Sequence, residues 1–106
     1  MWVSIDLCIV PLGVETSLAP YIAICKEIFD KKGLDYELGP NGTALEGEWE
    51  EVFDCVKDCH KAIHGSGVVR IYTTLKVNTR SDREQSFREK VPKVEAVISS
   101  PGSNRI

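Results

Sequence analysis

Apolar and polar residues alternate along two long segments of the chain. Residues 2–10, WVSIDLCIV, place every second apolar side chain on one face, and residues 68–80 do the same around VVRIYTTLKVNTR. A period of two is typical of a strand with one face on a core. Pro11 and Gly13 would end the first strand. The residues on the two apolar faces are Val3, Ile5, Leu7 and Ile9, and Val69, Ile71, Thr73, Leu75 and Val77.

Two shorter strands flank the dipeptide Asn41-Gly42. LDYELGP, from Leu34, and TALEGE, residues 43–48, are extended runs on either side of this turn signal, so a hairpin is expected.

Three other segments have the 3- and 4-residue apolar spacing of helices. The first is capped by Thr16 or Ser17 and stops at Gly33, and the second covers Glu48 to His64. A third opens on the capping box Ser81-x-x-Glu84, with Pro92 expected to kink or split it. Its inward residues would be Phe87, Val91, Val94 and Ile98.

The expected order is therefore βαββαβ with an additional C-terminal helix. Right-handed crossovers give this order an antiparallel four-stranded sheet with helices on one face, the α+β sandwich called ferredoxin-like. We expect one domain over residues 1–98 and a flexible tail over 99–106.

Composition narrows the function classes. The chain has 106 residues, 42% of them hydrophobic, and this length and apolar content are ordinary for one globular domain. A net charge of -3 without a basic stripe argues against nucleic acid. No apolar run is long enough for a membrane span and no signal peptide is visible, so we expect a cytoplasmic protein. Its four cysteines are then expected to be reduced, and neither a metal nor a cofactor is expected.

The sheet face away from the helices mixes acids, cations, a phenol and a thiol. We call it the outer face. One interpretation is an ordinary wet surface. The other is a sheet that pairs with a second copy, burying Arg70 against Glu46 or Asp6, because buried charges must be paired. Its expected members are Ser4, Asp6, Cys8, Glu46, Arg70, Tyr72, Thr74 and Lys76.

The segment PNGTALEGEW, residues 40–49, brings a hydroxyl and a carboxylate onto one short strand. Alternation puts Glu46 on the outer face, roughly across from Asp6 and Arg70. Thr43 would then lie on the opposite face, so the two could share a ligand only through a bulge or a partner subunit.

The chain resembles the small thiamine-binding proteins related to YkoF-like domains. The resemblance is carried by VPLG, SLAPYI, GPNGTALEGEW and GVVRIYTTLKVNTRSD, over roughly residues 3–90. It implies a non-catalytic binder of thiamine or its hydroxymethylpyrimidine part. It also implies dimers formed sheet to sheet, often paired into tetramers.

The chemistry of thiamine suggests which side chains would serve such a ligand. Its aminopyrimidine needs hydrogen bonds, and its cationic thiazolium favours an aromatic ring. Hydrogen bonds could come from Ser17, Thr43, Glu46 and Thr73, ring contacts from Tyr21 and Trp49, and Arg70 completes the candidate set. Ser17 could instead cap a helix, and Thr73 could be a satisfied core hydroxyl.

Two other functions remain open. One is a small enzyme of the dimeric ferredoxin-like type, for which His60 is the candidate acid or base. The other is a regulatory or structural interaction module that docks through the outer face.

Overall fold

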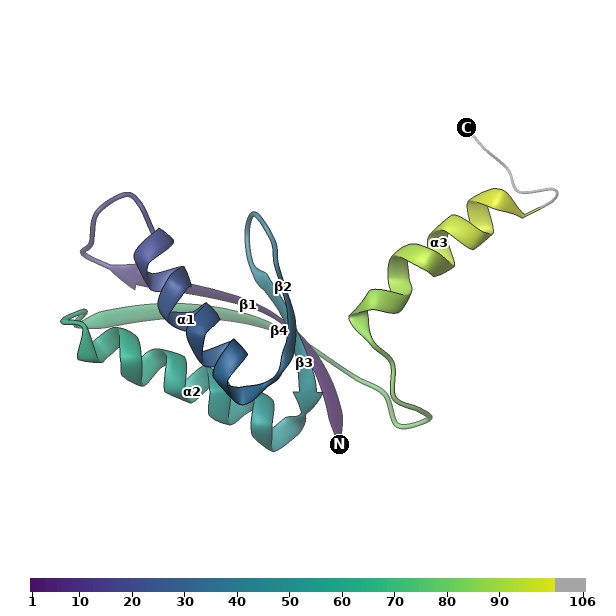
Figure 1. Ribbon diagram of the computed structural model, residues 1–106, viewed down its shortest axis with the longest axis horizontal. Coiled ribbons are helices and arrows are strands. Elements are labelled where there is room, and N and C mark those ends of the chain that lie inside the picture. The colour runs from purple at the N-terminus through teal and green to yellow at the C-terminus, as the bar shows by residue number, and fades with distance from the viewer. Residues whose placement is uncertain (101–106) are drawn as a thin grey trace.

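The computed structural model of the protein describes residues 1–100. Its elements follow the predicted βαββαβ order and add a C-terminal helix (Figure 1). They are β1 (Trp2–Leu12), α1 (Ala19–Lys32), β2 (Asp35–Leu38), β3 (Thr43–Glu48), α2 (Trp49–Gly65), β4 (Arg70–Thr79), the 3-10 turn η1 (Phe87–Glu89) and α3 (Lys90–Ser99).

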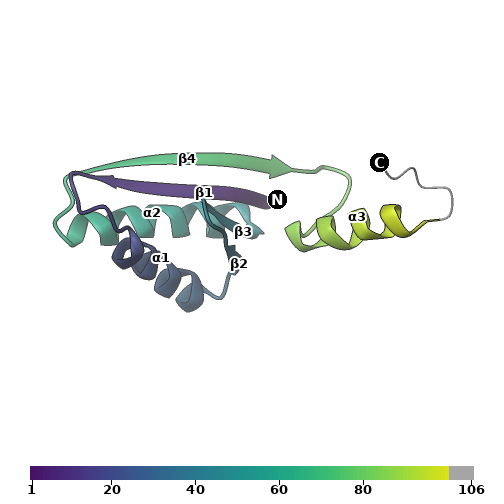
Figure 2. The same ribbon diagram turned by 90° about the horizontal axis from the view of Figure 1, so that it is seen from above.

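The four strands form one antiparallel sheet in the order β2-β3-β1-β4. Helices α1 and α2 both lie on the same side of it, as the view along the sheet shows (Figure 2). The predicted α+β, ferredoxin-like fold is therefore confirmed.

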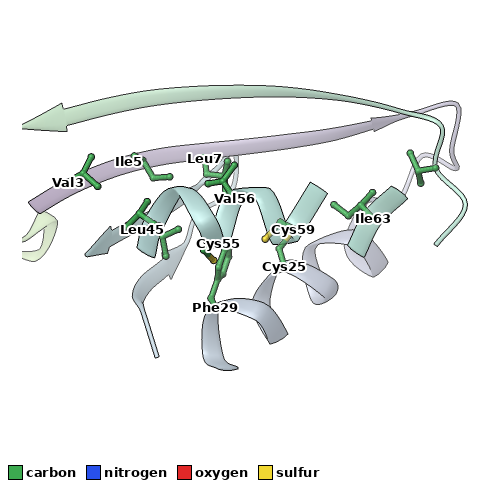
Figure 3. Close-up of a cluster of buried hydrophobic side chains, with 12 residues drawn as sticks. Val3, Ile5, Leu7, Cys25, Phe29, Leu45, Cys55, Val56, Cys59 and Ile63 are labelled. Carbon is green, nitrogen blue, oxygen red and sulfur yellow. The ribbon is translucent and has the colours of Figure 1, made fainter. Parts of the chain in front are cut away.

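The core fills the space between the sheet and these two helices. Alternate residues of β1, namely Val3, Ile5 and Leu7, are buried there, and Leu45 joins them from β3 opposite Ile5 (Figure 3). Each such side chain contributes roughly 1.5–3 kcal/mol on burial. The helices supply Cys25, Phe29, Val52, Cys55, Val56, Cys59 and Ile63.

Helix α1 ends where the sequence predicts, but its N-cap lies one or two residues later than predicted. Gly33 takes the left-handed conformation (φ 68°), and its N–H bonds the carbonyl of Asp30, which closes the helix. The predicted cap by Thr16 or Ser17 is wrong, because the N-cap position is Leu18 and no side chain caps it. The hydroxyl of Ser17 is therefore not used by the helix.

The C-terminal arm, residues 80–99, departs furthest from the sequence prediction. The capping box is made by Ser86 and Glu89 rather than by Ser81 and Glu84. Ser86 Oγ accepts from the Arg88 N–H (3.1 Å), and Glu89 accepts from the Ser86 N–H (2.8 Å). Residues 81–86 form no helix, and Arg80 makes an ion pair with Asp82 at the start of this segment.

Pro92 does not kink the last helix. Helix α3 begins at Lys90, so Pro92 lies in its first turn, where no intrahelical N–H bond is lost.

The apolar residues of α3 do not reach the core. The helix extends past the end of the sheet at which β1 begins (Figure 1), and Val91, Val94, Val97 and Ile98 are all exposed, Val97 by 66%. The predicted inward packing of Val91, Val94 and Ile98 is wrong, because the arm leaves the sheet before the helix starts. Phe87, the fourth residue predicted to point inward, is half-buried.

Of the predicted tail 99–106, residues 101–106 lie outside the described part of the chain. Within residues 1–100, the helices are all too short or too polar to span a membrane.

Candidate functional site

A pocket of about 460 Å³ opens on the helix side of the sheet, between α1, β1 and the turn from β2 to β3. We call it the helix-side pocket. Leu7 and Ile9 of β1, Ile22 of α1 and Ile63 of α2 make its walls largely apolar. Its size falls in the ordinary range for small-molecule sites.

Three neutral polar side chains line this pocket: Tyr21 from α1, Asn41 from the turn and Thr43 from the start of β3. Among the described residues, none of the three has a side-chain hydrogen-bond partner. Asn41 is exposed, and Tyr21 and Thr43 are half-buried, so their polar groups are accessible to a ligand. Accessible polar groups beside apolar walls are suited to orient a flat, uncharged or cationic ligand.

The turn that closes the pocket depends on Gly42. Its carbonyl accepts from the N–H of Gly39 (2.8 Å), which closes the predicted hairpin. A Cβ on Gly42 would lie 2.7 Å from Oδ1 of Asp6 and 3.3 Å from the carbonyl oxygen of Leu7. Glycine is favoured here by the close approach of β1, beside the turn that carries Asn41 and Thr43 to the pocket.

Of the seven residues predicted from the sequence, Tyr21 and Thr43 line the helix-side pocket. Trp49 does not line it and instead packs on Phe53 within α2. Ser17 is exposed in the loop before α1 and directly precedes Leu18, which also lines it. Asn41 is the lining residue that the prediction missed, although its place beside Thr43 in an otherwise apolar surround was a usable signal.

Thr73 lies on the helix side of β4, where it pairs with Ile9, and its hydroxyl is 2.7 Å from Nε2 of His60. Burial, followed by the neighbouring His64, lowers the pKa of His60. The His60 side chain therefore has a hydroxyl partner within the fold, and it does not line the pocket.

Glu46 lies on the outer face, as alternation predicts, and is only 3% exposed. Its carboxylate accepts from Ser86 Oγ (2.6 Å) and from the Phe87 N–H (2.9 Å). The arm beyond β4 therefore covers Glu46, and no sequence signal linked residues 40 positions apart.

The expected placement of Glu46 across from Asp6 and Arg70 is wrong. Glu46 pairs with Ser4, Asp6 pairs with Ala44 and Lys76, and Arg70 pairs with Leu12 at the other end of β1. Arg70 is exposed there. The register of β1 thus separates these charges within one chain.

Three of the four cysteines are buried in the core between α1 and α2, close to the pocket, as expected for small apolar thiols. Hydrogen bonding of the Cys59 thiol to the sulfurs of Cys25 and Cys55, together with burial, raises the pKa of Cys59. Cys25 lines the pocket wall.

Comparison with known proteins places the chain in a family. A family model described as thiamine-binding protein matches residues 5–95. The chain belongs to this family. A relative from Synechocystis, a UPF0045 protein, is 45% identical over 100 residues, covering 94% of this chain and 83% of the relative. Another, from Methanothermobacter thermautotrophicus, is 38% identical and covers 91% of this chain and 99% of the relative.

Solved structures of the family have the same fold. A hypothetical protein from Methanocaldococcus jannaschii superposes with a TM-score of 0.80 at 30% identity, covering 89% of this chain and 96% of its own. A Thermotoga maritima protein, assigned provisionally to thiamine biosynthesis or salvage, gives a TM-score of 0.75 at 28% identity, covering 89% of this chain and 99% of its own.

Proposed function

We propose that the chain binds thiamine, or its hydroxymethylpyrimidine part, in the helix-side pocket without converting it. The observation that carries this proposal is the set of three unpaired polar side chains, Tyr21, Asn41 and Thr43, in an otherwise apolar pocket of about 460 Å³. Membership of the thiamine-binding protein family supports the same ligand.

Each part of thiamine has a suitable surface in this pocket. The aminopyrimidine presents donors and acceptors on one edge, which Thr43 and Asn41 can meet with a hydroxyl and an amide. The flat ring can lie against Leu7 and Ile9. The Tyr21 ring can hold the thiazolium by cation–π attraction.

Residues outside the lining enter the proposal in other roles. Ser17 is proposed at the mouth of the pocket, beside Leu18. Thr73 is proposed to affect ligand binding indirectly, through Ile9, its neighbour on β1, which lines the pocket. Glu46 and Arg70 lie on the outer face, so a ligand role for either would require a second subunit.

Self-association through the outer face is also part of the proposal. Tyr72, 64% exposed, and Leu12 are apolar surfaces on that face, and α3 adds the exposed Val91 and Val94. A second copy would bury these side chains. Sedimentation of the pure protein tests this part alone, because a monomer at all concentrations would contradict it.

Calorimetric titration tests the ligand. Thiamine and hydroxymethylpyrimidine should both release or absorb heat, and the pyrimidine should retain much of the affinity. Thr43→Val should weaken binding by roughly threefold to tenfold, since it removes one hydrogen bond while preserving shape. Thr74→Val, an exposed threonine on the outer face of β4, is the matched control and should bind as wild type. An absence of heat at millimolar thiamine would overturn the proposal.

A further inference from the structure

A second cavity, of about 320 Å³, lies at the opposite side of the sheet from the helix-side pocket. We call it the basic cavity. It is bounded by the outer face of β1 and β4, through Ser4 and Asn78, and by the C-terminal arm. Glu46 positions this arm by binding Ser86 and Phe87, so the cavity is built by the fold rather than by a loose chain end.

The wall of the basic cavity carries four cations in a protein whose net charge is -3. They are Arg80, Arg83, Lys90 and Lys93. Among the described residues that line the cavity there is no aspartate or glutamate. The charge of this site is thus opposite to that of the whole chain.

Ion pairs within the arm neutralise these cations only in part. Asp82 binds Arg80, with Arg80 Nε donating at 2.8 Å. Glu89 is shared between Arg83, at 3.4 Å, and Lys93, at 3.8 Å. Lys90 has no ion-pair partner within residues 1–100. Two carboxylates therefore pair with three of the four cations, which leaves an excess of positive charge facing the cavity.

Two aromatic side chains, Trp2 and Phe87, also line the cavity. Trp2 Nε1 is buried without a hydrogen-bond partner, and in residues 1–100 no other buried side-chain nitrogen or oxygen is left unpaired. An unpaired buried donor is costly, so it favours an acceptor in the cavity. Phe87 supplies a second ring, with the Arg88 guanidinium 4.8 Å from its centroid.

We propose that the basic cavity binds a small phosphate-bearing anion, either free phosphate or the phosphate group of an aromatic ester. The phosphate oxygens would accept from Lys90, Lys93 and Arg83, since charge-assisted bonds to phosphate are among the strongest in proteins. Trp2 Nε1 would supply a neutral donor. The cavity is larger than a bare phosphate, and the rings of Trp2 and Phe87 suit a flat group attached to it.

Fluorescence of Trp2 reports directly on this site. The chain has two tryptophans, and Trp49 packs on Phe53 of α2 and does not line the cavity. The variant Trp49→Phe therefore leaves Trp2 as the single reporter. It is titrated at low salt with inorganic phosphate, phenyl phosphate and phenol.

The proposal expects phosphate and phenyl phosphate to change Trp2 fluorescence in a saturable way that added potassium chloride weakens. Tighter binding of phenyl phosphate would identify an ester as the ligand class, and equal affinities would identify free phosphate. Binding of phenol as tight as that of phenyl phosphate would overturn the proposal. An absence of any fluorescence response to inorganic phosphate and phenyl phosphate at about 10 mM would also overturn it, because this concentration is well above a weak dissociation constant of about 1 mM.

A pair of lysine variants locates the binding. Lys90→Gln, made in the Trp49→Phe background, should weaken phosphate binding by roughly tenfold, because one charge-assisted contact is lost. Lys61→Gln removes an exposed lysine from α2 and should leave phosphate binding unchanged. Equal weakening of phosphate binding in both variants would contradict the proposed location of the site. Circular dichroism checks that each variant is folded. Thiamine binding to the helix-side pocket should be the same in both variants, which separates this proposal from the proposed function.

Discussion

The helix-side pocket and the basic cavity lie on opposite faces of one sheet, and β1 contributes to both. Leu7 and Ile9 face the apolar pocket, whereas Trp2 and Ser4 line the cationic cavity. The pocket uses unpaired neutral groups, and the cavity uses charges that ion pairs only partly satisfy. The difference teaches that a strand of period two can carry two unrelated kinds of site without conflict.

The two sites also differ in how they are held. The pocket is surrounded by α1, α2 and the sheet, so the hydrophobic core fixes it. The cavity depends on an arm fastened by Glu46 and by the Arg88 ion pair with Asp35. Changes to the core and to the arm should therefore separate them.

The largest effect is expected from Phe29→Ala. Phe29 is 1% exposed, lines the pocket and packs on Tyr36 with ring centroids 5.2 Å apart. Its removal should lower the free energy of unfolding by about 3–5 kcal/mol, measured by urea denaturation. Ile22→Ala, a half-exposed pocket residue, is the control and should cost much less. Equal losses would show that the pocket is not fixed by the core.

Glu46→Gln should release the arm while leaving the core folded. The amide can accept only one of the two bonds that the carboxylate accepts, so docking of the arm should weaken by about 2 kcal/mol. Hydrogen exchange at the Phe87 amide should rise, with exchange in β1 unchanged. Glu27→Gln on the exposed side of α1 is the control. Unfolding of the whole chain would contradict this separation.

Gly42→Ala should have a smaller effect at the mouth of the pocket. The added Cβ meets the movable Asp6 carboxylate and the fixed Leu7 carbonyl, so a loss of about 1 kcal/mol is expected by thermal unfolding. The double variant with Asp6→Ser should recover part of this loss. Gly65→Ala, where a Cβ meets nothing within 4 Å, is the control. A loss in that variant too would mean that the close approach is not the cause.

The smallest effect is a pH dependence of arm docking. The Arg88 guanidinium holds the pKa of Asp35 below its usual range. A depressed carboxyl pKa gives stability that is present above the unfolded value, about pH 4, and is lost as pH falls through the folded value. Trp2 fluorescence in the Trp49→Phe protein should follow this change, and Asp35→Asn should abolish it. Asp54→Asn should not alter this pH dependence. The same dependence of fluorescence on pH in both variants would contradict the assignment of the transition to Asp35.

Local patterns predicted most of the domain. The alternation in β1 and β4 predicted the right faces except at Val69, which precedes β4 and is 91% exposed. Gly33 ended α1 where expected, because side-chain period and backbone freedom are properties of the local chain. The 3- and 4-residue apolar spacing within α2 falls on residues that are buried, Val52, Val56, Cys59 and Ile63.

The errors occur where distant segments compete for the same residues. Ser81 and Glu84 match the capping box as well as Ser86 and Glu89 do, but Glu46 binds Ser86 and so favours the later start. The apolar residues of α3 were predicted to face the core because their spacing indicates an apolar helix face, but spacing does not show which surface, if any, covers that face.

By itself, the sequence determined that the chain forms a βαββαβ sandwich and that Thr43 and Glu46 lie on opposite faces of their strand. Only the tertiary structure decided that Thr43 joins Tyr21 and Asn41 in a pocket while Glu46 holds the arm. The reason is physical: alternation fixes the direction of each side chain, but the register of β1 against β3 and β4 and the path of the arm fix its neighbours.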